Sequence, residues 1–355
     1  MGAATGLKTV GQAPGRVTIA DVSSALGLTK STVSRALNGY PDISESTRTR
    51  VRAMAERMGY RPLSHAQAIK TGRARSLGLV IQMADHDAHR PFLAEFLAGI
   101  SRGASAEGWT LTVATSTSEA DTLEVMQSLT ADRKADGFIL PRTEVNDARI
   151  DMLRDRNVPF VLFGRTADPA GCAWYDIRGE VAMAMAVDRL HAFGHRRIGF
   201  VNGGRRYFYS TKRREGFEEA MTRLGLTPTG VVEDAVTAAD GEAATRALLD
   251  RTDPPTALVF AVEAAAMGSY RAARDMGLGI GRDLSVISYD GLAEGAKTDP
   301  PLTTFEVDFS TAGARLSHLL IRRIRGEPPE DLRETALSRL RVGASDGPPI
   351  PKTKK

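Results

Sequence analysis

The sequence predicts an α/β protein with a small helical domain ahead of a larger region, and two features of its 355 residues carry this prediction. Residues 17–38 have the pattern of two short helices joined by a tight glycine turn. From Leu77 onward, short apolar strands alternate with amphipathic helices, which is typical of a parallel sheet covered on both faces. We therefore expect three helices first and an α/β region after them.

The first helix is predicted to begin at Thr18. Thr18 and Asp21 have the spacing of a capping box, which satisfies backbone donors at a helix start. Gly27 is expected to end this helix. The apolar residues before Gly27 recur on one helical face, and they are Ile19, Val22 and Leu26.

The second helix is predicted to follow Thr29, a favourable N-cap residue, and to turn Val33, Ala36 and Leu37 inward. Its outward polar residues gather around its amino-terminal half, and they are Thr29, Lys30, Ser31, Ser34 and Arg35. A helix-turn-helix places its base-contacting side chains at this position. The pattern therefore indicates a DNA-reading element, and the alternative is an ordinary pair of surface helices.

A third helix is predicted from its N-cap Ser44 to Gly59, which completes a three-helix unit of the minimum size that buries a core. In the segment that follows, Pro62 can start a short helix and Gly72 can stop it. Fewer than about 12 residues rarely stay helical in water, so this segment needs a partner to hold its shape.

Charge is distributed unevenly along the chain. Residues 1–76 hold 12 Lys or Arg against 4 Asp or Glu, a net charge of +8, whereas the rest holds 35 against 39, a net charge of −4. A basic end supplies the salt-sensitive, sequence-independent part of DNA affinity. We expect about half of the candidate phosphate contacts to touch DNA, and these are Arg48, Arg50, Arg52, Arg57, Arg61 and Lys70.

Together these motifs resemble the lactose-repressor (LacI/GalR) family of bacterial transcription regulators. The resemblance begins in residues 18–38, continues through residues 59–62 and includes the alanine-rich segment after them. Each motif alone is weak, but jointly they are highly specific and extend over nearly the whole chain. Further matches follow in the family's order, at residues 194–199, 213–217, 284–290 and 300–304.

The resemblance implies a two-lobe sensor of the periplasmic-binding-protein type, with a doubly wound parallel sheet in each lobe. The chain is expected to cross between lobes near Tyr175 and Phe305 and to return a final helix, residues 310–325, to the first lobe. In such sheets ligands collect beyond the carboxyl ends of the strands, here in the cleft between the lobes. The strands are expected at residues 77–81, 110–113, 137–140 and 160–163 of the first lobe and at 198–201, 257–260 and 284–287 of the second.

The expected domain boundaries follow from this organisation. They are a disordered leader at 1–15, a helix-turn-helix domain at 16–61, a hinge helix and linker at 62–76, an effector-binding and dimerisation domain at 77–345 and a tail at 346–355. Within the sensor, the first lobe takes about 77–175 and 306–337, and the second takes 176–305 and 338–345.

Asp290 and Arg213 match positions that bind effector in the family. A carboxylate and a guanidinium facing one cleft can hold vicinal hydroxyls by bidentate hydrogen bonds, and the alternative is a structural ion pair. The resemblance adds three aromatic positions, whose alternative role is core packing, and one more cleft-facing arginine. These residues are Phe92, Trp174, Phe309 and Arg165.

Two departures from the family's pattern concern the cleft and the hinge. Val262 and Glu263 stand where the family usually carries Asn and Asp, which removes an amide from the cleft floor and leaves open whether Glu263 takes the role of the Asp. Ile69 stands where the family most often has a leucine wedge. Isoleucine is still apolar and can enter a minor-groove step, although its branched Cβ alters the fit.

The resemblance implies a homodimer that reads two major-groove half-sites, while paired hinge helices bend the operator at a minor-groove step. Lys30 and Ser31 are the expected discriminators among operators, and Arg35 is a candidate for a guanine contact. Further expected DNA contacts are Thr18, Asn38, Ala66 and Ile69. A small carbohydrate effector is expected to release the repressor through a coupling of about 1–3 kcal/mol, or roughly 5- to 150-fold in affinity.

Composition and motifs weigh against other classes of protein. A sugar-binding transport component would need a signal peptide and no basic leading domain, and an enzyme would need a catalytic base near a cofactor or metal motif. We expect no cofactor, no metal and no catalytic residue. The single cysteine, Cys172, excludes an internal disulfide, and no apolar run approaches the ~20 residues of a membrane span. These features favour a cytoplasmic regulator.

Overall fold

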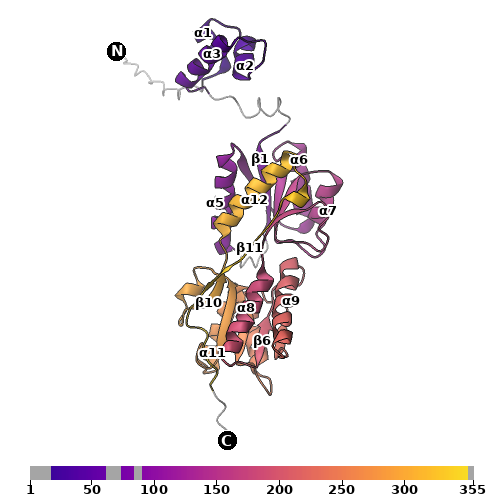
Figure 1. The fold of residues 1–355 in the computed structure, drawn as a ribbon, viewed down its shortest axis with the longest axis vertical. Helices are drawn as coiled ribbons and strands as arrows, with labels where there is room; N and C mark the ends of the chain where they lie inside the picture. Colours follow the sequence, from indigo (N-terminus) through magenta and orange to yellow (C-terminus); the bar gives the residue numbers. More distant parts are fainter. Residues whose placement is uncertain (1–16, 61–72, 84–89, 351–355) are drawn as a thin grey trace, which may run out of the picture. The chain divides into compact units, whose positions relative to one another are not determined.

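A computed structural model describes residues 17–60, 73–83 and 90–350 of the chain (Figure 1). The chain divides into two compact units, Met1–Ala74 and Arg75–Lys355. The expected leader lies outside the described residues, and so does most of the expected hinge, including Ala66 and Ile69. The candidate phosphate contacts Arg61 and Lys70 lie outside them as well.

The described part of the first unit consists of three helices, and their predicted starts are confirmed. Both hydrogen bonds of the Thr18–Asp21 capping box are present. Gly27 ends the first helix with φ +64°, and the side chain of Thr29 accepts from the backbone N–H of Thr32 at 3.0 Å. The helices are α1 (Ile19–Leu26), α2 (Lys30–Leu37) and α3 (Glu45–Arg57).

Apolar residues of all three helices form the core of this unit. The side chains that are almost completely buried come from α1, α2 and α3, and they are Val22, Val33, Ala36, Val51 and Ala55. Because α2 turns its apolar face into this core, its remaining polar residues are left for the surface.

The second unit contains two six-stranded sheets, one in each lobe. The first sheet has the order β11-β5-β4-β3-β1-β2, and all its pairings are parallel. Its strands are β1 (Ser76–Gln82), β2 (Thr110–Ser116), β3 (Gly137–Pro141), β4 (Phe160–Phe163), β5 (Ala173–Ile177) and β11 (Arg333–Ala336). The helices of this lobe are α5 (Arg90–Ala106), α6 (Glu119–Ala131), α7 (Ala148–Asp155) and α12 (Phe309–Ile324).

The second sheet has the order β12-β10-β9-β8-β6-β7, in which only β12 runs antiparallel to its neighbour. This sheet and the first one confirm the predicted α/β fold of two parallel-dominated lobes. Its strands are β6 (Ile198–Val201), β7 (Gly230–Val232), β8 (Ala257–Phe260), β9 (Ser285–Asp290), β10 (Thr303–Glu306) and β12 (Arg339–Arg341). The helices of this lobe are α8 (Gly179–Ala192), α9 (Phe208–Arg223), α10 (Ala238–Leu249) and α11 (Glu263–Asp275).

The chain crosses from one sheet to the other three times, after β5, after β10 and after β11. The crossings predicted near Tyr175 and Phe305 are confirmed to within a few residues, because β5 ends at Ile177 and β10 at Glu306. The final helix also returns to the first lobe as predicted, where α12 lies beside α5 (Figure 1).

Two predicted boundaries at strands are wrong by a few residues. Ser76 was expected in the linker, but it is the first residue of β1 and pairs with Thr110. Asp290 was expected directly after a strand that ends at Ile287, but β9 continues and Asp290 is its last residue. Both strands are longer than their apolar runs because polar residues at strand ends still complete the backbone ladder.

The tail predicted from residue 346 begins later in the structure. The carboxylate of Asp346 is fully buried and forms an ion pair with Arg189 at 2.5 Å. The carbonyl of Gly347 lies 2.8 Å from Nε2 of the buried His195. The second lobe therefore includes these two residues, because they supply partners that its buried polar groups need.

Glycines allow α12 to approach α5 closely. A Cβ atom on Gly99 of α5 would lie 2.2 Å from the carbonyl oxygen of Ser310, and one on Gly313 of α12 would lie 2.5 Å from that of Phe96. The close approach of α12 to α5 places the first residue of α12, Phe309, at the edge of the first sheet where the cleft opens.

No described helix of the chain is long and apolar enough to cross a membrane.

We expect Gly99→Val to lower the free energy of unfolding by about 3 kcal/mol or more, because backbone atoms of α12 cannot yield as a side chain would. Chemical denaturation followed by circular dichroism measures the loss. Ala98→Val is the matched control, since Ala98 is the exposed neighbour on the same helix. Equal stability of the two variants would contradict the close helix contact.

Candidate functional site

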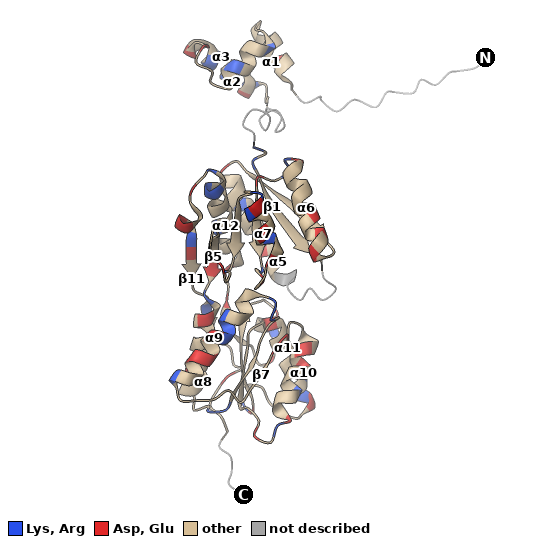
Figure 2. Cartoon of the chain, turned by 90° about the vertical axis from the view of Figure 1, so that its right-hand side faces the viewer, with Lys and Arg blue, Asp and Glu red and all other residues tan. Residues whose placement is uncertain are grey.

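The polar residues expected to read DNA lie at the surface of the first unit. Thr18, Thr29, Lys30, Ser31, Arg35 and Asn38 are exposed, and Ser34 is half-buried. Figure 2 shows basic residues on α2 and α3 of this unit. The amino-terminal half of α2 therefore has hydrogen-bond donors and acceptors at the protein surface, where a DNA duplex can reach them.

Some of these side chains already have partners within the unit. Arg35 forms an ion pair with Asp42 at 2.6 Å, and its guanidinium lies 5.4 Å from the centre of the Tyr40 ring. The amide of Asn38 donates to the carbonyl of Ser34 at 2.7 Å. Because a guanidinium has five N–H donors, Arg35 keeps donors for a base while it is held by Asp42.

The candidate phosphate contacts divide into two kinds. The Arg48 guanidinium donates to the carbonyl of Ile43 at 3.1 Å, so this side chain braces the turn before α3. Arg50, Arg52 and Arg57 are exposed on α3. These three are better placed than Arg48 to reach the phosphate backbone of a duplex.

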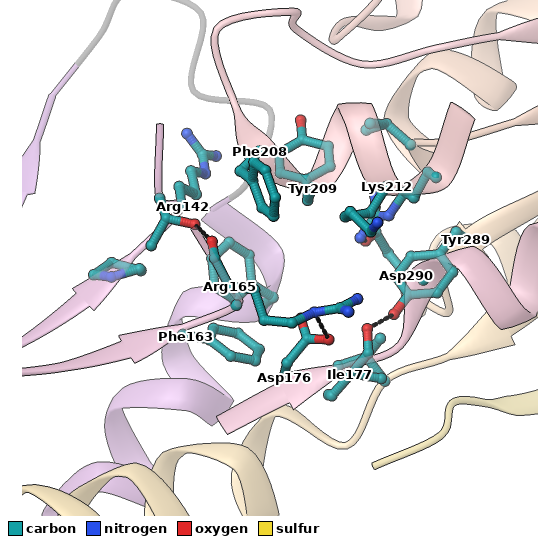
Figure 3. Close-up of a pocket in the computed structure, with 18 of the residues that line it drawn as sticks. Arg142, Phe163, Arg165, Asp176, Ile177, Phe208, Tyr209, Lys212, Tyr289 and Asp290 are labelled. Carbon is teal, nitrogen blue, oxygen red and sulfur yellow. Dashed lines mark hydrogen bonds and ion pairs between the residues drawn. The ribbon is translucent and has the colours of Figure 1, made fainter. Parts of the chain in front are cut away.

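A cavity of about 120 Å³ lies between the two lobes of the second unit (Figure 3). It opens at the carboxyl ends of the central strands of both sheets, which is where ligands collect in folds of this type. Its lining includes Phe92, Arg142, Phe163, Arg165 and Phe309 from the first lobe and Tyr209, Lys212, Arg213, Tyr289 and Asp290 from the second. Five of the six predicted effector contacts are therefore brought together.

Arg213 of α9 is fixed against two aromatic rings at the floor of this cavity. Its guanidinium lies 3.9 Å from the centre of the Tyr289 ring and 4.5 Å from that of Tyr209. Its Nη1 donates to the carbonyl of Ala261 at 2.5 Å. Contacts of this kind hold a guanidinium in one orientation before any ligand arrives.

Asp290 lies across from Arg213, but the two do not form a hydrogen-bonded ion pair. Arg213 Nη2 and Asp290 Oδ1 are 4.0 Å apart, beyond hydrogen-bond distance. Burial raises the pKa of Asp290, and the nearby charge of Arg213 opposes that rise. A structural ion pair was the alternative for these residues, and the separation leaves both groups able to hydrogen-bond a third.

The backbone at Asp290 has a left-handed conformation, with φ +118°, which is rare for a residue with a side chain. The Asp290 carboxylate accepts a hydrogen bond from the backbone N–H of Glu263 at 3.2 Å. Strain of this kind persists only when the surrounding structure fixes it, and such strain concentrates at functional sites.

Arg165 connects the lobes at a second charged cluster. Its Nε lies 2.8 Å from Asp176 Oδ2, and its Nη2 donates to Glu180 Oε2 of α8 at 2.7 Å. Burial raises the pKa of Asp176, with the Arg165 charge opposing it. Burial also acts on Glu180, but hydrogen bonds from its own backbone N–H and from Arg165 lower the pKa of Glu180 overall.

Aromatic rings of the first lobe form an apolar wall of the cavity. The ring centres of Phe92 and Phe309 are 4.7 Å apart, and those of Phe163 and Phe309 are 6.4 Å apart with the planes nearly perpendicular. Both predicted phenylalanines pack on the core as well as on the cavity. Core packing and ligand contact were the two alternative roles for Phe92 and Phe309, and their position allows both.

Trp174 does not line the cavity, which corrects the prediction for this residue. Its ring packs on the core between the first sheet and the helices α6 and α7, and Arg333 covers it at 4.4 Å. Asp176 lies two residues later on the same face of β5 and does line the cavity. Trp174 is one strand repeat too far from the carboxyl end of β5 to reach the cleft.

Tyr209 and Tyr289 line the cavity but were not predicted. Within the described residues, the buried hydroxyl of Tyr209 has no hydrogen-bond partner. Burial raises the pKa of Tyr209 to about 12, so this hydroxyl stays protonated and can donate. The sequence contained one indication that Tyr209 lines the cavity. Tyr209 precedes Arg213 by one helical turn, so the two side chains lie on the same face of α9.

Glu263 turns away from the cavity, whereas its neighbour Val262 lines it. The Glu263 carboxylate accepts hydrogen bonds from the backbone N–H groups of Gly291 and Gly295, at 2.9 and 3.2 Å, and from the Thr304 hydroxyl at 2.9 Å. Burial raises the pKa of Glu263 to about 7. Glu263 therefore holds the turn after β9, and it does so next to Asp290.

Two family models match the chain. One describes bacterial regulatory proteins of the lacI family and matches residues 18–63. The other describes a periplasmic binding protein-like domain and matches residues 187–345.

Curated relatives match over most of their length. The chain is 35% identical over 343 residues to the HTH-type transcriptional regulator AglR of Rhizobium meliloti, covering 94% of this chain and 95% of that protein. It is 32% identical over 322 residues to the HTH-type transcriptional regulator MalR of Streptomyces coelicolor, covering 87% and 91%. Both relatives are named as regulators of transcription and not as enzymes.

Solved structures match as well. A complex of the transcriptional regulator CelR with cellobiose has a TM-score of 0.72 at 27% identity, covering 93% of this chain and 100% of that one. A lac repressor dimer bound to operator and the anti-inducer ONPF has a TM-score of 0.77 at 24% identity, covering 94% and 100%. At that identity the second likeness supports the fold alone.

The raised pKa of Glu263 predicts a dependence of stability on pH. An unfolded glutamate ionises near 4.3, whereas folded Glu263 keeps its proton until about pH 7, so the folded state loses stability as the pH rises through that window. We expect the difference in free energy of unfolding between the wild type and Glu263→Gln to change by about 1–3 kcal/mol from pH 4.5 to pH 7.

Denaturant titrations at several pH values measure this difference. Glu219→Gln is the control, because Glu219 is exposed on α9. If Glu263→Gln and Glu219→Gln followed the wild type with the same pH slope, the buried carboxyl would not be the source of the dependence.

Proposed function

The chain belongs to the LacI family of bacterial regulatory proteins and is a DNA-binding regulator of transcription, and we propose that it represses its target genes. We propose further that a small, uncharged carbohydrate bound between the two lobes releases it from the operator. The observation that carries the proposal is the cavity to which the two lobes together contribute Arg213, Asp290 and an aromatic wall.

The charges around the cavity favour an uncharged effector. Arg165 already faces Asp176 and Glu180, and Lys212 forms an ion pair with Glu215. These basic groups are neutralised within the protein, so a phosphate or carboxylate would have to displace a carboxylate to bind them. A neutral ligand avoids that exchange.

The remaining groups suit a polyhydroxylated ligand. Between Arg213 and Asp290, separated by 4.0 Å, one hydroxyl can accept from the guanidinium and donate to the carboxylate. The Tyr209 hydroxyl adds a donor, and Phe92 and Phe309 add apolar surface for the C–H face of a sugar ring. The neighbouring structure with cellobiose makes disaccharides the first ligands to test.

We place the protein in the cytoplasm as a homodimer, since two recognition helices are needed to read two half-sites. Operator release then requires that the effector prefer one arrangement of the lobes over the other, because equal affinity for both arrangements would shift nothing.

The cavity assignment predicts that Arg213→Ala and Asp290→Ala lose ligand binding while they keep operator binding. In a thermal-shift screen of neutral mono- and disaccharides, a ligand at a hundred times its Kd stabilises by about 2.7 kcal/mol, and we expect this stabilisation to vanish in both variants. Trp174→Phe is the matched control, because Trp174 lies outside the cavity.

Ligand binding that survives in both variants would refute the cavity as the effector site. The same ligand is expected to weaken operator affinity, measured by fluorescence anisotropy with labelled duplex. Tighter operator binding in its presence would make the ligand a co-repressor and would contradict the proposed release.

The DNA-reading face predicts different effects from two kinds of exposed residue. Lys30→Ala and Ser31→Ala should change the ranking of sequences in a selection from random duplexes, at about 1–3 kcal/mol for each contacted base pair. Arg52→Ala should weaken binding to all sequences alike and lower the salt slope by about 1. An unchanged ranking in both α2 variants would remove α2 from sequence reading.

A further inference from the structure

Two short segments, one from each lobe, pair with each other beside the cavity between the lobes. The backbone N–H of Val145 donates to the carbonyl of Arg206 at 2.9 Å, and that of Phe208 donates to the carbonyl of Thr143 at 2.9 Å. These bonds flank an isolated antiparallel bridge between Glu144 and Tyr207. We call this pairing of residues 143–145 with residues 206–208 the interlobe seam.

Side chains reinforce the interlobe seam. The Glu144 carboxylate of the first lobe forms an ion pair with the Arg206 guanidinium of the second. The guanidinium groups of Arg206 and Arg142 lie 5.2 and 5.8 Å from the centre of the Tyr207 ring. The Arg206 side chain is 49% exposed, so water and salt reach the ion pair and the contact can open without burying a bare charge.

The loops that carry the seam are braced within their own lobes. In the first lobe the backbone N–H of Glu144 donates to Asp147 at 3.0 Å, and Arg149 donates to the same carboxylate at 2.7 Å. In the second lobe the backbone N–H of Arg205 donates to Asp234 at 2.8 Å. The seam therefore parts more readily between the lobes than by deformation of either loop.

Residues of the seam line two different cavities. Thr143 and Phe208 line the cavity described above, which we call the inner cavity, whereas Glu144, Arg206 and Tyr207 line a second cavity, also of about 120 Å³. Side chains that alternate along paired strands point to opposite faces, so the seam forms a wall between the two spaces. In Figure 3, Phe208 lies on the opposite side of the inner cavity from Asp176 and Ile177. Asp176 and Ile177 are at the end of β5, where the chain first crosses between the lobes.

We propose that the interlobe seam is a latch that holds the lobes closed over the inner cavity. The three crossings retain the lobes on one side of the cavity, and the seam retains them on the other. A ligand reaches Arg213 and Asp290 when the latch opens, and the latch re-forms behind it. The latch rests on the proposed function only in identifying that ligand as the effector.

The test needs no ligand. Val262, the N-cap residue of α11, lines the inner cavity and is only 1% exposed, so Val262→Cys places a buried reporter thiol there. The rate of its alkylation by N-ethylmaleimide measures how often the cavity opens. The natural Cys172 is buried between the first sheet and the helices α6 and α7, away from the inner cavity. The protein without the reporter gives the background alkylation rate of Cys172.

In the reporter protein we expect Glu144→Ala and Arg206→Ala each to raise the alkylation rate about tenfold, which is the effect of 1.4 kcal/mol on an opening equilibrium. The exchanged pair Glu144→Lys with Arg206→Glu should return the rate to within about twofold of the reporter protein, since the ion pair is restored with reversed polarity. Arg223→Ala is the matched control, because Arg223 is a similarly exposed arginine of the second lobe that pairs with Asp188 and not with any residue of the seam.

Equal alkylation rates in the reporter protein, the single variants and the exchanged pair would overturn the latch. An equal acceleration by Arg223→Ala would also overturn it, because the effect would then be loss of a surface charge. Phe309→Cys, also buried in the cavity lining, serves as reporter if Val262→Cys does not fold. Failure of every carbohydrate to bind would contradict the proposed effector and leave these rates unaffected.

Discussion

The sensor depends on one constraint, which is that both parallel sheets direct their carboxyl ends at the same cleft. Arg142, Arg165 and Asp176 come from the ends of β3, β4 and β5, and Val262 and Asp290 come from the ends of β8 and β9. A parallel sheet leaves its loops and last side chains at one edge, so two facing edges concentrate polar groups that neither lobe could gather alone. The three crossings keep those edges opposed.

This concentration of buried charge is stable because each group has a defined partner. Arg165 pairs with Asp176 of its own lobe and Glu180 of the other, Glu263 accepts hydrogen bonds from backbone N–H groups, and Arg213 stacks on two tyrosines. Burial of an unpaired charge would cost several kcal/mol, so these partners are a condition for placing Asp290 in a strained backbone at the cavity. The strain is held by groups that do not touch the ligand site, Glu263 above all.

The sequence predicted what local chemistry decides. The caps at Thr18 and Thr29 and the turn at Gly27 depend on residues a few positions apart, and the structure agrees with them. Trp174 and Glu263 show the limit, because the distance of a residue from a strand end and the direction of a side chain depend on neighbours far along the chain. The resemblance predicted Arg213 and Asp290 at the cleft, and both line the cavity, whereas Tyr209 was not predicted although it lies one helical turn before Arg213.

The lobes contact each other in two places, through the Arg165–Glu180 ion pair in the cavity lining and through the interlobe seam. These two contacts determine which interactions between the lobes a bound effector can change. The Arg165–Glu180 pair lies in the cavity lining, so a ligand there interacts with an ion pair that also holds the lobes. The interlobe seam has an ion pair of its own, Glu144–Arg206, and it also contacts the Arg165 backbone, because the Thr143 hydroxyl donates to the Arg165 carbonyl at 2.6 Å. Under the function proposed above, an effector changes operator affinity only through its difference in affinity between lobe arrangements, and such couplings are typically about 1–3 kcal/mol. Because the Arg165–Glu180 and Glu144–Arg206 ion pairs share no residue, the proposed function allows ligand affinity and coupling to DNA to be altered by different substitutions.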